Sequence, residues 1–98
     1  MTLNDYRRRI DEVDRELVRL LNRRAQMSIQ LGQLKKETGL PMRDHVREDT
    51  ILRHVQRANP GPLDERALAA IFRTILEESR RITGELLAEA EALSKVAE

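Results

Sequence analysis

Two cationic and two small side chains follow one another at helical spacing: Arg24, Ser28, Gly32 and Lys35. Steps of four, four and three residues place all of them on one face of an α-helix. A packed core would carry bulky apolar residues there, so cations separated by small residues leave a hollow with positive walls. Because arginine and lysine donate charged hydrogen bonds to carboxylates, we predict that this hollow binds a small anion.

Each of these residues also has a purely structural interpretation. Arg24 continues the spacing of an apolar seam, where a guanidinium could pair with a protein carboxylate or fix the helix register. Gly32 could allow a close helix crossing, and Ser28 could be a tolerated small residue. A buried cation must meet an anion in either case, because leaving it unpaired is costly. The residues taken together favour a pocket.

Polar residues also interrupt the apolar pattern of a later segment. Ser79 stands in the apolar register between Ile75 and Ile82, and Thr83 follows one turn further on. Either hydroxyl could instead bond back to a carbonyl of its own helix. The pattern indicates that polar atoms of this segment turn inward.

Four charged residues cluster where a short helix is expected to begin: Arg43, Asp44, Arg47 and Glu48. They could supply a backbone amide, a further cation and a carboxylate acceptor to the same pocket. A solvated, charged helix start is the alternative interpretation.

Three helices are expected to position these residues. Apolar residues recur at steps of three and four from Leu3, and Gly39 and Pro41 stop that pattern. Asp44 and Asp64 can cap two further helices. The expected helices cover about residues 3–38, 45–58 and 64–94 of a single domain over residues 1–98. The predicted fold class is therefore all-α, with one long, one short and one long helix.

The first helix is too long for the rest of the chain to cover. At about 50 Å, it cannot bury its apolar seam behind one short helix and another long helix that must itself be covered. A second copy of the chain is the simplest remedy. Two first helices packed antiparallel would bury both seams in one extended core, so we expect a homodimer.

Composition excludes several classes of function. The 18 Lys and Arg residues balance 17 Asp and Glu residues, which leaves no basic field for nucleic acid. Cysteine is absent, and His45 and His54 do not form a metal-binding pair at helical spacing, so we expect no metal. No segment approaches the roughly 20 apolar residues of a membrane span. We therefore expect a cytoplasmic protein that binds neither nucleic acid nor membrane.

Over most of its length, from about Leu3 to Thr83, the sequence closely resembles the all-helical, type II class of chorismate mutases. The segments that carry the resemblance are Arg7–Asp14, Leu20–Arg24, Gly32–Lys35, Pro41–Asp44, Arg47–Glu48 and Phe72–Ser79. Their order and spacing in a chain of this length are more specific than any one segment. The resemblance implies an intertwined antiparallel homodimer in which each of two active sites takes residues from both chains.

The resemblance also implies which residues hold the substrate carboxylates. Arg24 would clamp one carboxylate, and Lys35 and Arg7 of the partner subunit would hold the second. Arg7 lies about 25 Å from Arg24 along one straight helix, so the two converge on a small ligand only if one comes from an antiparallel partner. Within the run Arg7–Arg9, a solvated helix face is the other interpretation. By the same resemblance, Ser79 contacts a carboxylate.

Further roles follow from the resemblance alone. Lys35 would also approach the ether oxygen of the breaking bond, and Glu48 would accept a hydrogen bond from the ring hydroxyl with help from the backbone near Asp44. Arg47 would lie close to the site. Thr83 departs from the pattern, because these enzymes commonly carry Gln or Glu there to contact the ether oxygen, and the shorter threonine suggests a bridging water.

The implied activity is the conversion of chorismate to prephenate in phenylalanine and tyrosine biosynthesis. This [3,3] rearrangement is concerted, so no cofactor, nucleophile or external proton is expected. An isochorismate-pyruvate lyase of the same fold is the nearest alternative enzyme. A non-catalytic helical dimerisation or regulatory module is the alternative from another class, and a partner enzyme of the aromatic pathway is also compatible with the sequence.

Overall fold

The computed structural model describes residues 1–97 as three α-helices joined by two loops. Helix α1 spans Leu3–Thr38, α2 spans His45–Ala58 and α3 spans Glu65–Ala97. The predicted all-α class and its long, short and long helices are confirmed. Only α3 differs from the expected bounds, because it begins at Glu65 instead of residue 64 and continues beyond residue 94 to Ala97.

Local side-chain chemistry sets the helix ends. Thr2 and Asp5 form a reciprocal capping box at the start of α1, in which the Asp5 N–H donates to Thr2 Oγ1 at 3.2 Å. Gly39 ends α1 in the left-handed conformation at φ 72°. Asp44 Oδ1 accepts from the Arg47 N–H at 3.0 Å to start α2. Asp64 Oδ1 does the same for α3, where it accepts from the N–H of Ala67 at 2.8 Å.

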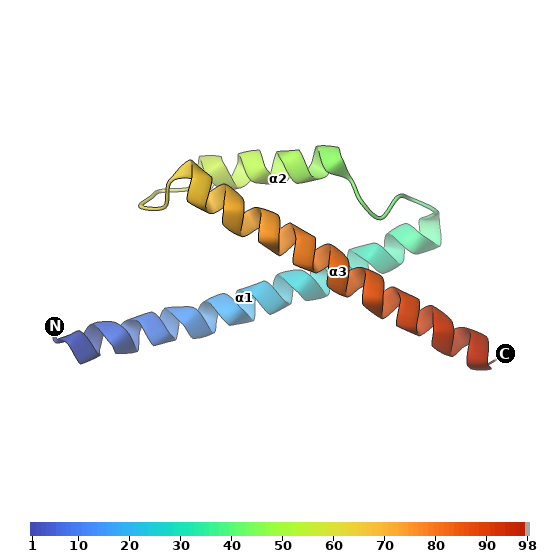
Figure 1. The fold of residues 1–98 in the computed structure, drawn as a ribbon, viewed down its shortest axis with the longest axis horizontal. Helices are drawn as coiled ribbons and strands as arrows, with labels where there is room; N and C mark the ends of the chain where they lie inside the picture. Colours follow the sequence, from blue (N-terminus) through green and yellow to red (C-terminus); the bar gives the residue numbers. More distant parts are fainter. Residues whose placement is uncertain (98) are drawn as a thin grey trace.

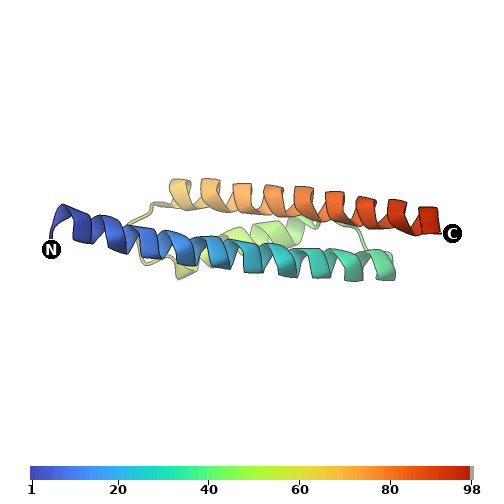
Figure 2. The same ribbon diagram turned by 90° about the horizontal axis from the view of Figure 1, so that it is seen from below.

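Helices α1 and α3 cross like the strokes of an X, and α2 lies along α3 on the side away from the N-terminal half of α1 (Figure 1). Seen from below, α1 and α3 form two layers that run in the same general direction (Figure 2). The crossing brings Gly32 of α1 against Thr83 of α3. Only a small core forms around it, with Leu76 and Leu87 as the buried apolar side chains of residues 1–97.

The chain is elongated, and much of its apolar surface is uncovered. It measures 62 × 30 × 15 Å, with a radius of gyration of 17.5 Å. A compact domain of this length has a radius of gyration of about 13 Å. The apolar seam that the sequence predicts along α1 is exposed, and we call its nine residues the α1 seam. Each is at least 45% exposed: Leu3, Tyr6, Ile10, Val13, Leu17, Leu20, Met27, Leu31 and Leu34.

The three helices are amphipathic rather than apolar throughout. Among residues 1–97, no helix is both long enough and apolar enough to cross a lipid bilayer.

Candidate active site

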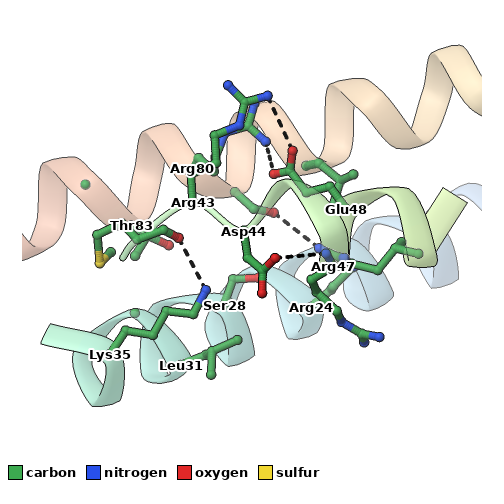
Figure 3. A pocket seen from close by; sticks show the side chains of 16 residues that line it. Arg24, Ser28, Leu31, Lys35, Arg43, Asp44, Arg47, Glu48, Arg80 and Thr83 are labelled. Atoms are coloured by element: carbon green, nitrogen blue, oxygen red, sulfur yellow. Dashed lines mark hydrogen bonds and ion pairs between the residues drawn. The ribbon is translucent and has the colours of Figure 1, made fainter. Parts of the chain in front are cut away.

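A pocket of about 280 Å³ opens beside the helix crossing and takes its walls from all three helices and the loop between α1 and α2 (Figure 3). Ten residues that the sequence singled out line it: Arg24, Ser28, Gly32, Lys35, Arg43, Asp44, Arg47, Glu48, Ser79 and Thr83. Residues far apart in the sequence therefore meet at one cavity.

The α1 wall of the pocket contains the two cations separated by small residues. Arg24 Nη1 donates to Ser79 Oγ at 3.5 Å, and Lys35 Nζ donates to the backbone carbonyl of Met42 at 3.3 Å. Within residues 1–97, neither cation lies within 4 Å of a protein carboxylate oxygen. Arg24 is also half-buried on the face of α1 that meets α3, whereas the α1 seam lies on the exposed side. The pairing of Arg24 with a protein carboxylate, one of its two structural interpretations, is therefore not found.

Gly32 combines two of the interpretations that the sequence allowed. A Cβ atom built there would overlap with Thr83 Cγ2 and lie 3.2 Å from Met42 Cε, so glycine is what permits the close crossing. The same residue also lines the pocket. Close packing and the hollow are thus produced by one missing side chain.

Thr83 brings an unsatisfied hydroxyl to the pocket. The residue is 4% exposed, and among residues 1–97 its Oγ1 has no hydrogen-bond partner. A buried hydroxyl without a hydrogen-bond partner destabilises the folded protein by about 1–3 kcal/mol. A ligand atom or a water that forms a hydrogen bond with it removes that penalty. The prediction that Thr83 turns inward agrees with this burial.

Glu48 lies between two arginines, and one of them was not anticipated. Arg43 Nη2 is 3.4 Å from Glu48 Oε1, and Arg80 of α3 forms an ion pair with Glu48 Oε2 (Figure 3). Arg80 also lines the pocket.

A signal for Arg80 was present in the sequence. The residues that α3 buries are Leu76, Thr83 and Leu87, one position away from the register of Ile75 and Ile82. Steps of four, three and four place Arg80 in the buried register, between Leu76 and Thr83. Because apolar residues occur at both registers, the sequence did not show which register faces the chain's own core.

Arg7 is the one predicted site residue that does not reach the pocket of its own chain. It lies in the exposed N-terminal part of α1, about 25 Å along the helix from Arg24. It is not among the residues that line the cavity.

The charges around the pocket favour a ligand with more than one negative charge. Five cationic side chains line it (Arg24, Lys35, Arg43, Arg47 and Arg80) against two carboxylates (Asp44 and Glu48), an excess of three positive charges. Such a site can bind carboxylates through charged hydrogen bonds and can stabilise negative charge that develops on a bound molecule. No group of three metal-binding side chains occurs in the described part of the chain.

Comparison with known proteins identifies similar chains. The family model described as chorismate mutase type II matches residues 6–83. A bifunctional chorismate mutase/prephenate dehydratase from Neisseria gonorrhoeae is 42% identical over 73 residues, which cover 74% of this chain and 20% of the relative. The chorismate mutase of Methanocaldococcus jannaschii is 24% identical over 94 residues, which cover 95% of each protein. The chain thus spans about a fifth of the bifunctional relative and nearly all of the other.

A solved structure has the same fold. Chorismate mutase (form II) from Thermus thermophilus superposes with a TM-score of 0.81 at 32% identity. The match covers 84% of this chain and 93% of the other.

Proposed function

Because the chain belongs to the type II chorismate mutase family, we propose that it converts chorismate to prephenate in the pocket described above. The observation that carries the proposal is the pair Arg24 and Lys35, two half-buried cations that face a cavity without a protein carboxylate beside them. Chorismate carries two carboxylates, so its negative charges can pair with these two cations.

The reaction needs little beyond charge and shape. One carbon–oxygen bond breaks while one carbon–carbon bond forms in a single concerted step, so no nucleophile or external proton is required. The pocket holds the two arms of the substrate close together. Much of the entropy cost of reaching the reactive conformer is therefore met on binding and not in the chemical step. Its cations stabilise the negative charge that grows on the ether oxygen as the bond stretches.

Arg24, Lys35 and Ser79 bind the acidic groups of the substrate in this proposal. Arg24 clamps one carboxylate together with Ser79, whose hydroxyl accepts a hydrogen bond from Arg24. Lys35 holds the other carboxylate and also approaches the ether oxygen. Its contact with the Met42 carbonyl is to a neutral acceptor, which a carboxylate can replace with a stronger interaction.

The first turn of α2 recognises the substrate ring. Glu48 accepts a hydrogen bond from the ring hydroxyl, with the backbone near Asp44 beside it, and the guanidinium of Arg47 lies at the edge of the site. The unsatisfied hydroxyl of Thr83 binds a water that bridges to the ether oxygen, because threonine is too short to reach as a glutamine would.

A second copy of the chain completes the site. The uncovered α1 seam and the radius of gyration of 17.5 Å support an intertwined antiparallel homodimer. In this arrangement Arg7 of the partner subunit enters the pocket and binds a substrate carboxylate. The position of Arg7 on the uncovered part of α1 fits this role, since an antiparallel neighbour brings that part of the helix toward Arg24.

The product gives the protein its place in metabolism. Prephenate leads to phenylalanine and tyrosine, and we place the protein in the cytoplasm, where a prephenate-consuming enzyme is its expected functional partner. The bifunctional relatives, named chorismate mutase/prephenate dehydratase, support such a link.

One assay tests the proposal against the alternative enzyme of the same fold. The purified protein is incubated separately with chorismate and with isochorismate, and the products are separated by chromatography. Prephenate from chorismate at a rate far above the uncatalysed reaction is the expected result. Salicylate and pyruvate from isochorismate, with no prephenate from chorismate, would identify a lyase instead.

A second measurement addresses the non-catalytic module. A dicarboxylate mimic of the transition state should raise the melting temperature, because a ligand that binds only the folded protein stabilises it. A module that only dimerises would show neither this shift nor turnover.

A further inference from the structure

The carboxylate of Glu48 is held from two directions by residues of two different elements. Arg43, in the loop before α2, approaches Oε1 at 3.4 Å, and Arg80, in the middle of α3, pairs with Oε2 (Figure 3). Glu48 and Arg80 are 32 residues apart, and their side chains are 18% and 31% exposed. This half-buried ion pair therefore connects α2 to α3 beside the pocket.

Two cations on opposite oxygens restrict the orientation of a carboxylate. Charged hydrogen bonds are short and directional, so each arginine limits rotation about the last bond of the glutamate side chain. An ionised carboxylate offers about four acceptor positions, and two arginines leave capacity for a further donor. Glu48 can thus be held in place and still accept a hydrogen bond from a ligand.

We propose that Arg80 is a positioning residue, which holds the Glu48 carboxylate in the orientation that accepts the ring hydroxyl of the substrate. This inference rests on the proposed function, in which Glu48 contacts that hydroxyl. Arg80 acts through Glu48 and needs no contact with the reacting atoms. Its place in the buried register of α3, next to Thr83, is what brings a cation from α3 to the start of α2.

The neighbouring residue Arg81 provides a matched control. It pairs with Glu78 and Glu85 of its own helix at 2.7 and 3.1 Å, with a side chain that is 54% exposed. Exposed pairs at this spacing contribute little to stability. Arg81→Met therefore removes the same charge from the same turn of α3 without touching the pocket.

The experiment compares Arg80→Met, Arg81→Met and Glu48→Gln in the full chain. Arg80→Met should lower kcat/KM for chorismate about tenfold, the effect of losing one well-placed charged hydrogen bond, whereas Arg81→Met should change it less than about twofold. Adding Arg80→Met to Glu48→Gln should cause less than about a twofold further loss, because the residue then has no carboxylate left to orient. Losses that multiply in the double variant would overturn the proposal.

A substrate analogue separates positioning from a merely structural role. In a chorismate analogue with hydrogen in place of the ring hydroxyl, the bonds that break and form are unchanged, but Glu48 has nothing to accept from. Arg80→Met and the native protein should then differ by less than about twofold. An equal tenfold loss on chorismate and on the analogue would show that Arg80 acts in some other way.

Two further checks keep the outcome decisive. Melting temperature and oligomeric mass establish that each variant folds. If Arg80→Met does not fold, Arg80→Lys replaces it. Its kcat/KM should fall about threefold on chorismate and should not change on the analogue, because lysine keeps the charge but lacks the forked donor. A native protein without mutase activity would overturn the proposed function and this inference together, whereas an active native protein with unimpaired Arg80 variants would overturn this inference alone.

Discussion

The two halves of α1 show how differently one continuous helix can be stabilised. The C-terminal half, from Arg24 to Thr38, meets α3 at Gly32 and forms one wall of the pocket. The N-terminal half, from Leu3 to Leu21, has apolar residues at regular spacing, and its seam is exposed along the whole length. One half is thus folded against its own chain, and the other presents a surface that its own chain leaves uncovered.

This difference separates two requirements of the protein. The chain by itself produces a pocket with an excess of positive charge, so most of the site belongs to the tertiary structure. In the proposed dimer, a second copy of the chain covers the exposed seam and supplies the remaining cation, Arg7. A change in the N-terminal half should therefore act through assembly, and a change in the C-terminal half should act on the chemistry of a protein that still assembles.

The largest effect is expected from a charge placed in the N-terminal half of the α1 seam. Leu17→Glu would force a carboxylate into the proposed dimer core, where an unpaired charge is costly. We expect loss of the dimer and a fall in kcat/KM of more than about 1,000-fold, because the partner's contribution to the site disappears with it. Light scattering and the chorismate assay measure the two effects. Val96→Glu is the control, since Val96 is 85% exposed near the end of α3. A monomeric, fully active Leu17→Glu protein would contradict the proposed difference between the two halves of α1.

The next effect concerns the C-terminal half. Lys35→Ala should lower kcat by at least about 100-fold, because it removes a cation from the place where negative charge grows in the transition state. Dimer mass should stay unchanged. The adjacent Lys36, which pairs with Glu91 at 3.5 Å on an exposed face, provides the control variant Lys36→Ala. Near-normal turnover in a folded Lys35→Ala dimer would exclude the proposed role of Lys35.

A mixing experiment connects the two halves. Arg7→Ala and Lys35→Ala subunits should each be nearly inactive alone, but a mixed dimer contains one site with an intact Lys35 and an intact Arg7 of the partner subunit. After equal mixing and exchange, about half of the dimers are mixed and each has one good site of two, so activity should recover to about a quarter of the native value. No recovery, in a sample where mass spectrometry detects mixed dimers, would mean that both residues serve the same subunit's site.

The sequence was sufficient to predict the helices because their signals are local. Apolar spacing, the caps at Asp44 and Asp64 and the left-handed Gly39 depend on neighbours within a few residues. The orientation of each helix face was harder to predict. Periodicity defines a face but not what covers it, and the structure leaves the residues of the α1 seam exposed in the chain.

The site was predictable to a similar extent. The α1 wall followed from the spacing of Arg24, Ser28, Gly32 and Lys35 on one helix. That α2 and α3 bring their polar residues to the same hollow depends on tertiary packing. The residue pattern raised this only as one of two interpretations, and the resemblance to a known family favoured it. Arg80 was missed because two apolar registers one residue apart occur in α3, and sequence alone did not show which of them is buried.

The smallest expected effect tests what stabilises the N-terminal half within its own chain. The pKa of Asp5 lies below its ordinary value of 3.8. The main cause is the hydrogen bond that its carboxylate accepts from the backbone N–H of Thr2, and the second cause is a hydrogen bond with the Thr2 hydroxyl. A lowered pKa in the folded state contributes stability above the unfolded pKa, and this contribution is lost as the pH falls through the folded pKa. Asp5→Asn should therefore lower the melting temperature by a few degrees at most near pH 6, and the difference from the native protein should shrink below about pH 4. Thermal unfolding followed by circular dichroism between about pH 6 and pH 3 measures it. A difference that stays constant or grows as the pH falls would show that the capping box does not stabilise this half of α1 through the charge of Asp5.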